Sequence, residues 1–424
     1  MTSATGWVYA DPRVLSLDEV IRKALDNSYE LKIARVDVQI SKTDVLTARS
    51  DYFPNIQARL NTEYLKDLDN TFRPVTSVGN TIIPSGTRFQ NSMGLTLNQK
   101  ITDFGARGQK VRMAKSEVRA KQAVYDQMLR DLKIKMIELY EDALTNYRSI
   151  KANEAILALA QQGYQMKKRL NAAGNTSAVD VVTEAIQVAQ GLDELETLRH
   201  KYEESLHNLS FYTHEAYNPA ETELADLETG ALETLAPFSA INSPEALRFD
   251  AQIEQKEHEI AYLKRQKLPQ INFYSYYNFY GFDPDNWGDS VRNFSHRTVQ
   301  FGLTMSAPIF DGFKNKAAVD KAKLEKEKLM LQKTRVLAEL AHRAEGFQQK
   351  VHTQTVLLGT KAVILNKTQD KLTMDNRLSE QQVIDRTQTI QDHIARIHRQ
   401  LDTEKALIQQ ISAAKKLKVL EGGI

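Results

Sequence analysis

The sequence contains no cysteine among its 424 residues. This absence excludes disulfides, thiolate nucleophiles, cysteine-ligated zinc and acylation of an N-terminal cysteine, so any attachment to a membrane must be noncovalent. The chain also lacks an excess of charge, because 56 Lys and Arg stand against 54 Asp and Glu, and the basic residues are spread along helical segments. The electrostatic footprint of a nucleic-acid-binding protein is therefore missing, and we expect no nucleic acid partner.

Long hydrophobic runs are missing too. No run approaches the roughly 18–20 apolar residues that a membrane-spanning helix needs, and the mean hydropathy of -0.46 is that of a water-soluble protein. Residues 1–7 have neither a basic start nor an apolar core, so no secretory signal is visible. Two interpretations follow: a cytosolic protein, or an exported chain whose signal has been removed. The strand patterns described below favour the second.

The chain repeats its own pattern. The segment DYFPNI at residues 51–56 is similar to QKLPQI at 266–271, and GLTLNQKITD at 94–103 is similar to GLTMSAPIFD at 302–311. An internal duplication means that each copy builds half of one architecture. We expect an N-terminal extension over residues 1–16, structural repeat 1 over 17–213, an acidic, proline-containing connection over 214–243, and structural repeat 2 over 244–420.

Four segments alternate between polar and apolar residues with a period of two, which predicts strands with one apolar and one polar face. They cover about residues 55–65, 87–101, 270–280 and 297–309. Asn91 and Gln99 are polar exceptions on the apolar side of the second segment. Residues 66–86 and 281–288, between the strands of each pair, are rich in turn formers and predict loops.

The remaining pattern is helical and unusually long. After Gly105 and Gly108 a helical stretch of about 67 residues reaches residue 171, which corresponds to about 100 Å at 1.5 Å per residue. Apolar residues such as Leu132, Met136 and Leu139 recur every three or four positions, as in a coiled-coil seam. Residues 171–177 break the helix and a second seam returns, and the second repeat does the same over about 315–375 and 383–420. We therefore expect two antiparallel helical hairpins.

Strands of about 10 residues have the length that crosses the hydrocarbon layer of a bilayer when tilted. Four strands cannot close a barrel, and an open edge in lipid leaves backbone groups unpaired at several kcal/mol each, so strands from several chains must join. The apolar faces would then meet lipid, and the aromatic run at 273–282 is typical of a barrel rim. The predicted lipid-facing residues include Ile56, Leu60, Phe273, Phe279, Phe301 and Met305. The predicted lumen-facing residues include Arg59, Glu63, Arg88 and Asn98.

A different class of protein fits the same patterns. Four amphipathic strands can also form a soluble two-layer domain with polar outer surfaces. The alternative function is accordingly a soluble or peripheral coiled-coil scaffold without channel activity.

These features together resemble the TolC-like outer membrane factors, or outer membrane efflux proteins, of Gram-negative bacteria. The resemblance rests on the duplication, on the strand start Leu-Pro-x-Ile at residues 268–271 and Phe-Pro-x-Ile at 53–56, and on the strand exit Pro-Ile-Phe-Asp-Gly at 308–312. The first copy departs from that exit, with Lys100 in place of proline and Asp103-Phe104-Gly105 at its end. The resemblance covers nearly all of residues 17–420.

The resemblance implies a mixed α and β fold: a trimeric, twelve-stranded transmembrane β-barrel with four strands per chain, continued by a long periplasmic α-helical coiled-coil tunnel. It also implies the exit duct of a tripartite efflux or type I secretion system, in the outer membrane of a Gram-negative bacterium with most of the mass in the periplasm. The implied partners are two sister chains in a homotrimer, a periplasmic adaptor (membrane fusion) protein, an inner-membrane RND or ABC transporter, and outer-membrane lipid.

Functional residues are implied at the turns between the long and returning helices. In the family these turns form the periplasmic end of the tunnel, where aspartates narrow the pore. Asp180 follows Gly174 with the family spacing, the second copy has Asn376 and Gln382 there, and Asp385 aligns with a second family aspartate. The implied pore constriction is therefore Asp180, Gln382 and Asp385, where carboxylates would favour cations.

Each of these assignments has a plainer alternative. Asp180 could instead cap the returning helix, a common role for Asp near a helix start. Exposed hairpin tips are what an adaptor can reach, but solvated turns without a partner have the same composition. The candidate adaptor-contact residues are Asn171, Gly174, Asn175, Ser177, Asn376, Arg377 and Ser379.

No pattern predicts catalysis. His200, His207 and His214 recur every seven residues and so lie about 10 Å apart along a helix, whereas zinc ligands must lie within about 2.1 Å of the ion. Asp103-Phe104-Gly105 copies a kinase tripeptide, but no Gly-rich phosphate loop accompanies it. We expect no catalytic residue, no metal site and no cofactor, so the energy for transport must come from a partner.

Overall fold

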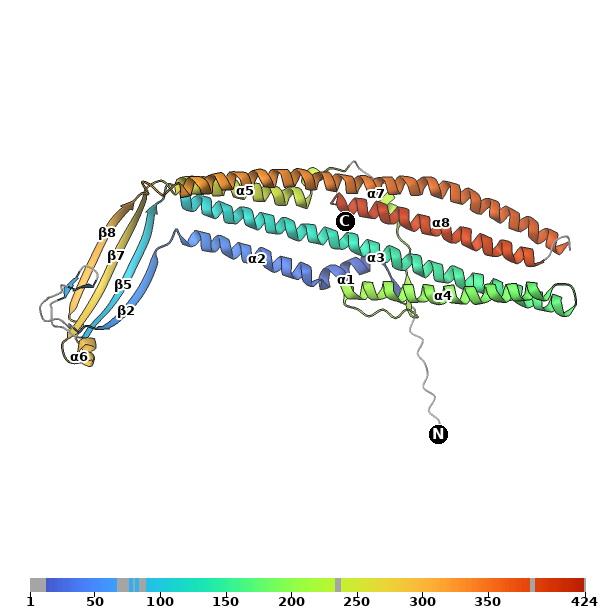
Figure 1. Ribbon diagram of the computed structural model, residues 1–424, viewed down its shortest axis with the longest axis horizontal. Coiled ribbons are helices and arrows are strands. Elements are labelled where there is room, and N and C mark those ends of the chain that lie inside the picture. The colour runs from blue at the N-terminus through green and yellow to red at the C-terminus, as the bar shows by residue number, and fades with distance from the viewer. Residues whose placement is uncertain are drawn as a thin grey trace, which may run out of the picture. The chain divides into compact units, whose positions relative to one another are not determined.

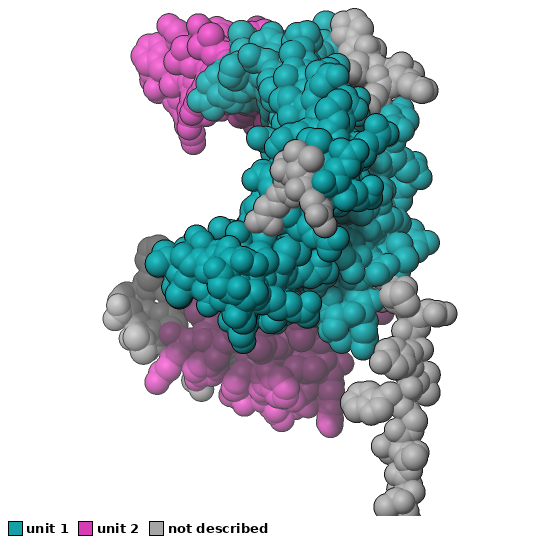
Figure 2. Space-filling model, turned by 90° about the vertical axis from the view of Figure 1, so that its right-hand side faces the viewer, with its two compact units in different colours: residues 1–36, 122–247, 333–424 teal, residues 37–121, 248–332 magenta. Residues whose placement is uncertain are grey.

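The computed structural model describes residues 13–66, 76–78, 81–83, 89–232, 238–381 and 386–422. The chain divides into two compact units, and each unit takes segments from both repeats (Figure 2). Unit 1 comprises residues 1–36, 122–247 and 333–424, and unit 2 comprises residues 37–121 and 248–332. Within the described residues, no helix is both long and apolar enough to cross a membrane.

Unit 2 contains one four-stranded antiparallel sheet (Figure 1). Its strands are β2 (Asn55–Tyr64), β5 (Phe89–Thr102), β7 (Gln270–Asp283) and β8 (His296–Ser306), in the spatial order β2-β5-β7-β8. Two strands come from each repeat, and β5 and β7 join the repeats through an antiparallel ladder. Strands β2 and β8 form the two edges of this sheet.

The strand register gathers the apolar residues on one face. Leu60 is opposite Met93, which is opposite Phe279. On the same face Ile56 is opposite Leu97, and Phe301 lies across from Ser275. Leu60 is 70% exposed and Phe301 is 73% exposed. Among the described residues of unit 2, most of this large apolar surface is therefore left uncovered, which is unusual for a face made of whole strands.

The two polar exceptions on this face have hydrogen-bond partners. Asn91 donates its side-chain amide to the hydroxyl of Ser290 on the short helix α6 (Trp287–Arg292). Gln99 donates to the backbone oxygen of Tyr52 at 3.1 Å. Helix α6 also contacts the face through Trp287, whose indole nitrogen donates to the hydroxyl of Thr62 at 2.9 Å. The predicted loop at 281–288 thus begins with the last three residues of β7 and ends with the first two of α6, which lies at this end of the sheet (Figure 1).

The predicted loop at residues 66–86 likewise contains some regular structure. Its described part includes the small antiparallel ribbon of β3 (Thr76–Val78) and β4 (Thr81–Ile83).

Each repeat turns from strand to long helix through the same corner. Asp103 accepts hydrogen bonds from the backbone nitrogens of Gly105 (3.1 Å) and Arg107 (2.8 Å). Asp311 accepts from the backbone nitrogen of Asn315 at 3.1 Å. Both corners place a phenylalanine in the left-handed region, Phe104 at φ 53° and Phe313 at φ 64°. The first copy therefore builds the same corner although its exit motif departs from that of the second.

Unit 1 contains long helices from both repeats. Helices α1 (Leu17–Asn27), α4 (Ala178–Thr213) and α8 (Arg386–Leu420) lie wholly within it. The helices that cross the unit boundary are α2 (Tyr29–Ser50), α3 (Ala106–Ala172), α5 (Pro244–Arg265) and α7 (Lys314–Glu380). Strand β1 (Arg13–Leu15) pairs in parallel with β6 (Thr222–Leu224). The short 3-10 helices η1 (Thr229–Leu232) and η2 (Ala240–Asn242) lie in the connection between the repeats.

The core of unit 1 has a fully buried tyrosine at its centre. The hydroxyl of Tyr140 lies 2.8 Å from the backbone oxygen of Leu15 and 2.7 Å from that of Ala225. This one side chain therefore joins α3 to β1 and to the chain just after β6. Buried apolar side chains of α3, α4 and α8 belong to the same core cluster as Tyr140, including Ile137, Leu144, Leu206, Leu209 and Leu417.

The helical turns differ between the repeats. Helix α3 ends at Ala172, close to the predicted break. Helix α7 continues to Glu380, so residues 376–380 extend the helix by more than a turn beyond its predicted end near residue 375. The reason is local, because Gly174 adopts φ 77° at the first turn, whereas the equivalent Asn376 is helical.

Candidate functional site

The polar face of the sheet forms a concave surface. A groove of 560 Å³ lies on it, and all of its lining residues come from β2, β5, β7 and β8. Strand periodicity puts them on one side, because alternate residues of paired strands share a face. The lining residues are Arg59, Asn61, Ser92, Gly94, Thr96, Tyr274, Tyr276, Asn278, Tyr280, Gln300 and Thr304.

A second groove of 640 Å³ adjoins the first along the same face. Tyr274, Tyr276 and Thr304 line both grooves, and Lys100 lines only the second. Asp51, at the border of the second groove, is paired with Lys110 at 2.8 Å. Its charge is thus matched by a cation outside the groove.

The residues predicted to line a lumen lie on this polar face where they are described. Arg59 is opposite Gly94, and Asn98 is opposite both Asn55 and Tyr274. Glu63 belongs to the same face four residues beyond Arg59, and it is exposed, as are Arg59 and Asn98. Arg88 lies outside the described residues.

The aromatic run of β7 is divided between the two faces. Tyr274 and Tyr276 lie on the polar face, whereas Phe273, Tyr277 and Phe279 lie on the apolar face. The sequence interpretation of the whole run as a barrel rim therefore missed the tyrosines of the groove. The signal that could have identified them is the alternation of the strand, because residues 274 and 276 alternate with positions 273, 275 and 277, which lie on the opposite face.

The first helical turn is closed by two compact motifs. At the end of α3, the backbone nitrogens of Gly174 and Asn175 donate to the oxygens of Asn171 (2.9 Å) and Leu170 (2.8 Å). This is a Schellman arrangement, and it requires the left-handed backbone that glycine adopts easily. The side-chain amide of Asn171 donates to the backbone oxygen of Thr176 at 2.8 Å. The candidate tip residues Asn171, Gly174 and Asn175 thus form an ordered turn.

Asp180 forms a capping box with Ser177 at the start of α4. The hydroxyl of Ser177 accepts from the backbone nitrogen of Asp180 at 3.1 Å, while Asp180 accepts from the Ser177 backbone nitrogen at 3.2 Å. Asp180 also accepts from the hydroxyls of Thr176 (2.8 Å) and Ser177 (2.9 Å). These bonds, that from Thr176 above all, hold the pKa of Asp180 below its ordinary value. Its carboxylate therefore stabilises the turn as the third helical residue, and Ser177 is the N-cap.

At the second turn, Gln382 and Asp385 lie outside the described residues. Asn376, Arg377 and Ser379 occupy the last turns of α7. Ser379 lines a groove of 1310 Å³ together with Glu380, Arg386 and residues of α3 such as Arg169. Within unit 1, this groove brings the ends of both helical hairpins to one site.

A carboxyl pair lies between α7 and α8 close to this turn. Lys371 donates to Asp392 at 2.5 Å and lies 3.8 Å from Asp375. A hydrogen bond with Asp392 raises the pKa of Asp375. Burial alone would raise the pKa of Asp392, but the bonds from Lys371 and Asp375 hold it below its ordinary value. The opposite pKa shifts are those expected for two carboxyl groups that share one proton beside Lys371.

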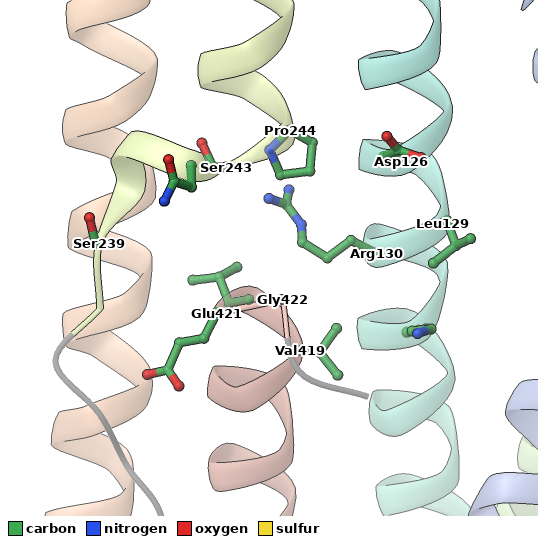
Figure 3. A pocket seen from close by; sticks show the side chains of 12 residues that line it. Asp126, Leu129, Arg130, Ser239, Ser243, Pro244, Val419, Glu421 and Gly422 are labelled. Atoms are coloured by element: carbon green, nitrogen blue, oxygen red, sulfur yellow. The ribbon is translucent and has the colours of Figure 1, made fainter.

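A smaller pocket of 250 Å³ lies between α3, the start of α5 and the end of α8 (Figure 3). Arg130 and Asp126 of α3 face it, together with Ser243, Pro244 and Glu421. Burial raises the pKa of the Glu421 carboxyl. Arg130 is held by Glu245 at 2.7 Å, so its charge is already balanced inside the protein.

The histidines of α4 do not form a metal site. His214 ends the helix in the left-handed conformation, and its ring centroid lies 5.1 Å from that of Tyr29. In the described part of the chain, no three His, Cys, Asp or Glu side chains gather closely enough to hold a metal ion.

Comparison with known proteins gives a family match for the first repeat. The model of the outer membrane efflux protein family matches residues 20–213. Over these residues, which form the first repeat, the chain resembles the outer membrane efflux proteins. The matched family is one of channels and not of enzymes. Comparison with curated proteins finds no match.

Solved structures extend the likeness to the whole chain. CusC, whose structures concern transmembrane channel formation, matches with a TM-score of 0.79 at 13% identity over 99% of this chain and 96% of CusC. VceC, an outer membrane protein of Vibrio cholerae, matches with a TM-score of 0.74 at 14% identity over 95% of this chain and 94% of VceC. The Campylobacter jejuni outer membrane channel CmeC matches with a TM-score of 0.74 at 14% identity over 94% and 85%. The predicted fold, with four strands per chain and long helices, is confirmed.

Proposed function

We propose that this protein is an outer-membrane exit duct that passes substrates from an inner-membrane pump across the periplasm and the outer membrane. Three chains close a twelve-stranded barrel, and most of the mass of the trimer lies in the periplasm. The duct serves a tripartite efflux or type I secretion system, in which a periplasmic adaptor connects it to an RND or ABC transporter. This proposal is supported by the family and by the surface chemistry of the sheet.

The observation that carries the proposal is the uncovered apolar face. Side chains such as Leu60, Phe301 and Leu303 are 69–73% exposed along the strands. In water, an exposed apolar surface that extends along whole strands is energetically unfavourable. In a bilayer the same face is matched to hydrocarbon, while the polar face opposite lines a watery lumen.

The two open edges, β2 and β8, supply the argument for an oligomer. Neighbouring strands of this sheet run antiparallel, so β2 and β8, as its first and fourth strands, point in opposite directions. The β8 edge of one chain can therefore pair antiparallel with the β2 edge of the next, and the ring closes with an even number of strands. An unpaired edge in lipid is excluded by the cost of its free backbone groups.

The remaining assignments belong to the same proposal. The two repeats, residues 17–213 and 244–420, each provide one strand pair and one helical hairpin. The helical turns are the periplasmic end, with Asp180, Gln382 and Asp385 at the constriction. The adaptor contacts the tips at Asn171, Gly174, Asn175, Ser177, Asn376, Arg377 and Ser379. Arg59, Glu63, Arg88 and Asn98 face the lumen.

Disulfide cross-linking tests the edge pairing, because the chain has no cysteine of its own. Leu60→Cys on β2 is combined in turn with Val299→Cys, Phe301→Cys and Leu303→Cys on β8. Three positions are tried because the structure of one chain does not fix which β8 residue lies opposite Leu60 of the next chain. One pair is expected to give covalent dimers and trimers after oxidation in detergent. The control replaces the edge residue by Met93→Cys on the central strand β5, which has no free edge and forms no link between chains.

The competing function is a scaffold without a channel. A chain that remains monomeric and dispersed in water without detergent, with no cross-link from any of the three pairs, would establish the scaffold and reject the duct. Fractionation with the outer membrane and a heat-sensitive detergent-stable oligomer would support the duct.

A further inference from the structure

The polar face of the sheet carries two tyrosine rings between two basic side chains. Tyr276 is opposite Thr96 and Gln300, and Tyr274 is opposite Asn98 and Gly302. The two ring centroids are 5.3 Å apart with the planes at 40°. Arg59 lies in the row beyond Tyr276, and Lys100 lies in the row beyond Tyr274. The two basic rows are six residues of β7 apart, about 20 Å at the rise of a strand.

Glycines keep this surface flat. A Cβ atom at Gly302 would lie 2.6 Å from the hydroxyl oxygen and 2.7 Å from Cζ of Tyr274. The Tyr274 ring therefore lies across the backbone of β8 instead of projecting from the wall. Gly94 plays the same part for Asn278, whose amide occupies the space that a Cβ would need. An aromatic side chain that covers a glycine on the next strand presents its ring face outward.

The two basic side chains are not neutralised by this face. Among the residues that the structure describes, neither Arg59 nor Lys100 has an ion-pair partner. The carboxylate of Glu63 lies two rows beyond Arg59, and Asp51 is paired with Lys110. The stretch from Arg59 to Lys100 thus combines ring faces, amides and uncompensated positive charge.

We infer that this surface, the tyrosine ladder of Arg59, Tyr276, Tyr274 and Lys100, binds small planar aromatic anions during their passage. A planar ring stacks on a tyrosine face, and its anionic group is held by the guanidinium of Arg59 or the ammonium of Lys100. Binding is weak, because a site inside a conduit must also release its cargo. The inference rests on the proposed duct, since only a barrel turns this face into a lumen wall.

Current block in a planar bilayer tests the ladder. The purified oligomer is recorded with 2-naphthoate as the probe and two comparison compounds. Decahydronaphthalene-2-carboxylate has the same charge and similar bulk without an aromatic face, and 2-naphthylmethylammonium has the ring with the opposite charge. We expect 2-naphthoate to give the longest blocks, because only this compound uses both the ring face and the basic side chain.

Matched variants assign the block to the ladder. Tyr276→Leu and Arg59→Gln are each expected to shorten the mean 2-naphthoate block about threefold to tenfold, the range of a lost aromatic pair. Tyr276→Phe keeps the ring and retains the block. Tyr277→Leu and Arg297→Gln change the same residue types on the opposite face, and they leave the block unchanged.

The outcomes separate this inference from the duct itself. The inferred binding at the ladder is wrong if the aromatic and the saturated anion give equal block times. It is also wrong if Tyr276→Leu and Tyr277→Leu have equal effects on the block. In both cases a conducting pore still supports the duct. An oligomer that forms no conducting pore overturns both.

Discussion

Arg130 of α3 and Glu245 at the start of α5 form a two-point ion pair that is closed off from solvent. The side chains are 7% and 6% exposed, and one of the two hydrogen bonds measures 2.7 Å. Burial by itself would lower the pKa of Arg130, but the hydrogen bonds to Glu245 and Asp131 raise the pKa of the guanidinium overall. The pair lies beside the pocket of Figure 3, where α3, α5 and the end of α8 meet.

Removing one partner of this pair should destabilise unit 1 strongly. Glu245→Ala leaves the buried guanidinium with the more exposed Asp131, at 2.9 Å, as its acidic partner, and we expect a loss of up to about 3–5 kcal/mol in the free energy of unfolding. Circular dichroism of the protein in detergent during thermal unfolding measures the effect. The double variant Arg130→Met with Glu245→Leu removes both charges and should recover most of the loss. An unchanged unfolding temperature for Glu245→Ala would contradict this account.

The buried hydroxyl of Tyr140 should matter for both stability and its dependence on pH. Tyr140→Phe leaves the backbone oxygens of Leu15 and Ala225 without their donor, which should destabilise the fold by about 1–2 kcal/mol. Burial raises the pKa of Tyr140 far above its ordinary value of 10.0. The folded state therefore favours the neutral phenol, and this stabilisation is present below pH 10 and is lost as the pH rises further.

The free energy of unfolding, measured from neutral to alkaline pH, tests this predicted loss of stability. The loss of stability above pH 10 should be smaller in Tyr140→Phe than in the wild type. It should not vanish, because burial also raises the pKa of Tyr202. A Tyr140→Phe variant whose alkaline loss equals that of the wild type would refute the assignment.

Asp180 and Ser177 allow the cap and the gate to be separated. Both side chains belong to the capping box, but only Asp180 carries charge. If Asp180 narrows the pore, Asp180→Asn reduces the cation preference of single channels, whereas Ser177→Ala loosens the turn and leaves the preference unchanged. The lowered pKa of Asp180 means that its charge should persist as the pH falls below 4. Equal selectivity of both variants and the wild type would leave Asp180 a helix cap and nothing more.

The carboxyl pair of Asp375 and Asp392 should make the second hairpin sensitive to pH. Because the pKa of Asp375 is raised, the stabilisation from its protonated form is complete below the ordinary carboxyl pKa and is lost as the pH rises through the raised value. Amide hydrogen exchange near residue 375, corrected for the intrinsic rate, should therefore speed up over that interval.

An isosteric variant provides the control for this pair. In Asp375→Asn the side-chain amide can donate to Asp392 at every pH. The corrected rate of amide hydrogen exchange near residue 375 should therefore become independent of pH. Asp370→Asn changes an exposed acid on the same helix, paired with Lys367 at 3.2 Å, and should keep the wild-type pH dependence. Persistence of the dependence in Asp375→Asn would exclude the shared proton.

Adjacent residues of β8 test which face meets lipid. Leu303 lies on the apolar face and Thr304 on the polar face. Leu303→Arg should reduce membrane assembly, because an arginine on the lipid face near the middle of the bilayer costs about 2–4 kcal/mol. Thr304→Arg places the same charge toward water and should assemble normally. The measurement is the yield of heat-modifiable oligomer in the outer membrane, and equal yields would argue against a lipid-facing surface.

Much of the fold could be predicted because its patterns are local. Alternation with a period of two assigned Leu60 and Arg59 to opposite faces without any knowledge of the partner strand. The spacing of Leu132, Met136 and Leu139 predicted a long helix with a seam. The end of α7 could not be predicted as well, because Asn376 is compatible with a turn and with a helix, and nothing in the neighbouring sequence separates the two.

The candidate site was predicted unevenly for the same reason. Asp180 was recognised as a cap or a gate because it lies near a helix start and six residues after Gly174, and both signals are local. The tyrosines of the ladder were recognised only as aromatic residues. Their orientation depends on Gly302, which lies on another strand and leaves the room in which the ring of Tyr274 lies flat.

The sequence by itself determined the duplication, the type of each long element and the side on which each strand residue lies, because these depend on spacing along one chain. Only the tertiary structure decided which strands are neighbours, so that β5 and β7 join the repeats and Tyr274 covers Gly302. It also decided that Asp375 of α7 and Asp392 of α8 lie beside the same lysine, Lys371. Contacts between distant residues depend on how elements pack, and packing energies are shared among many side chains that no local pattern records.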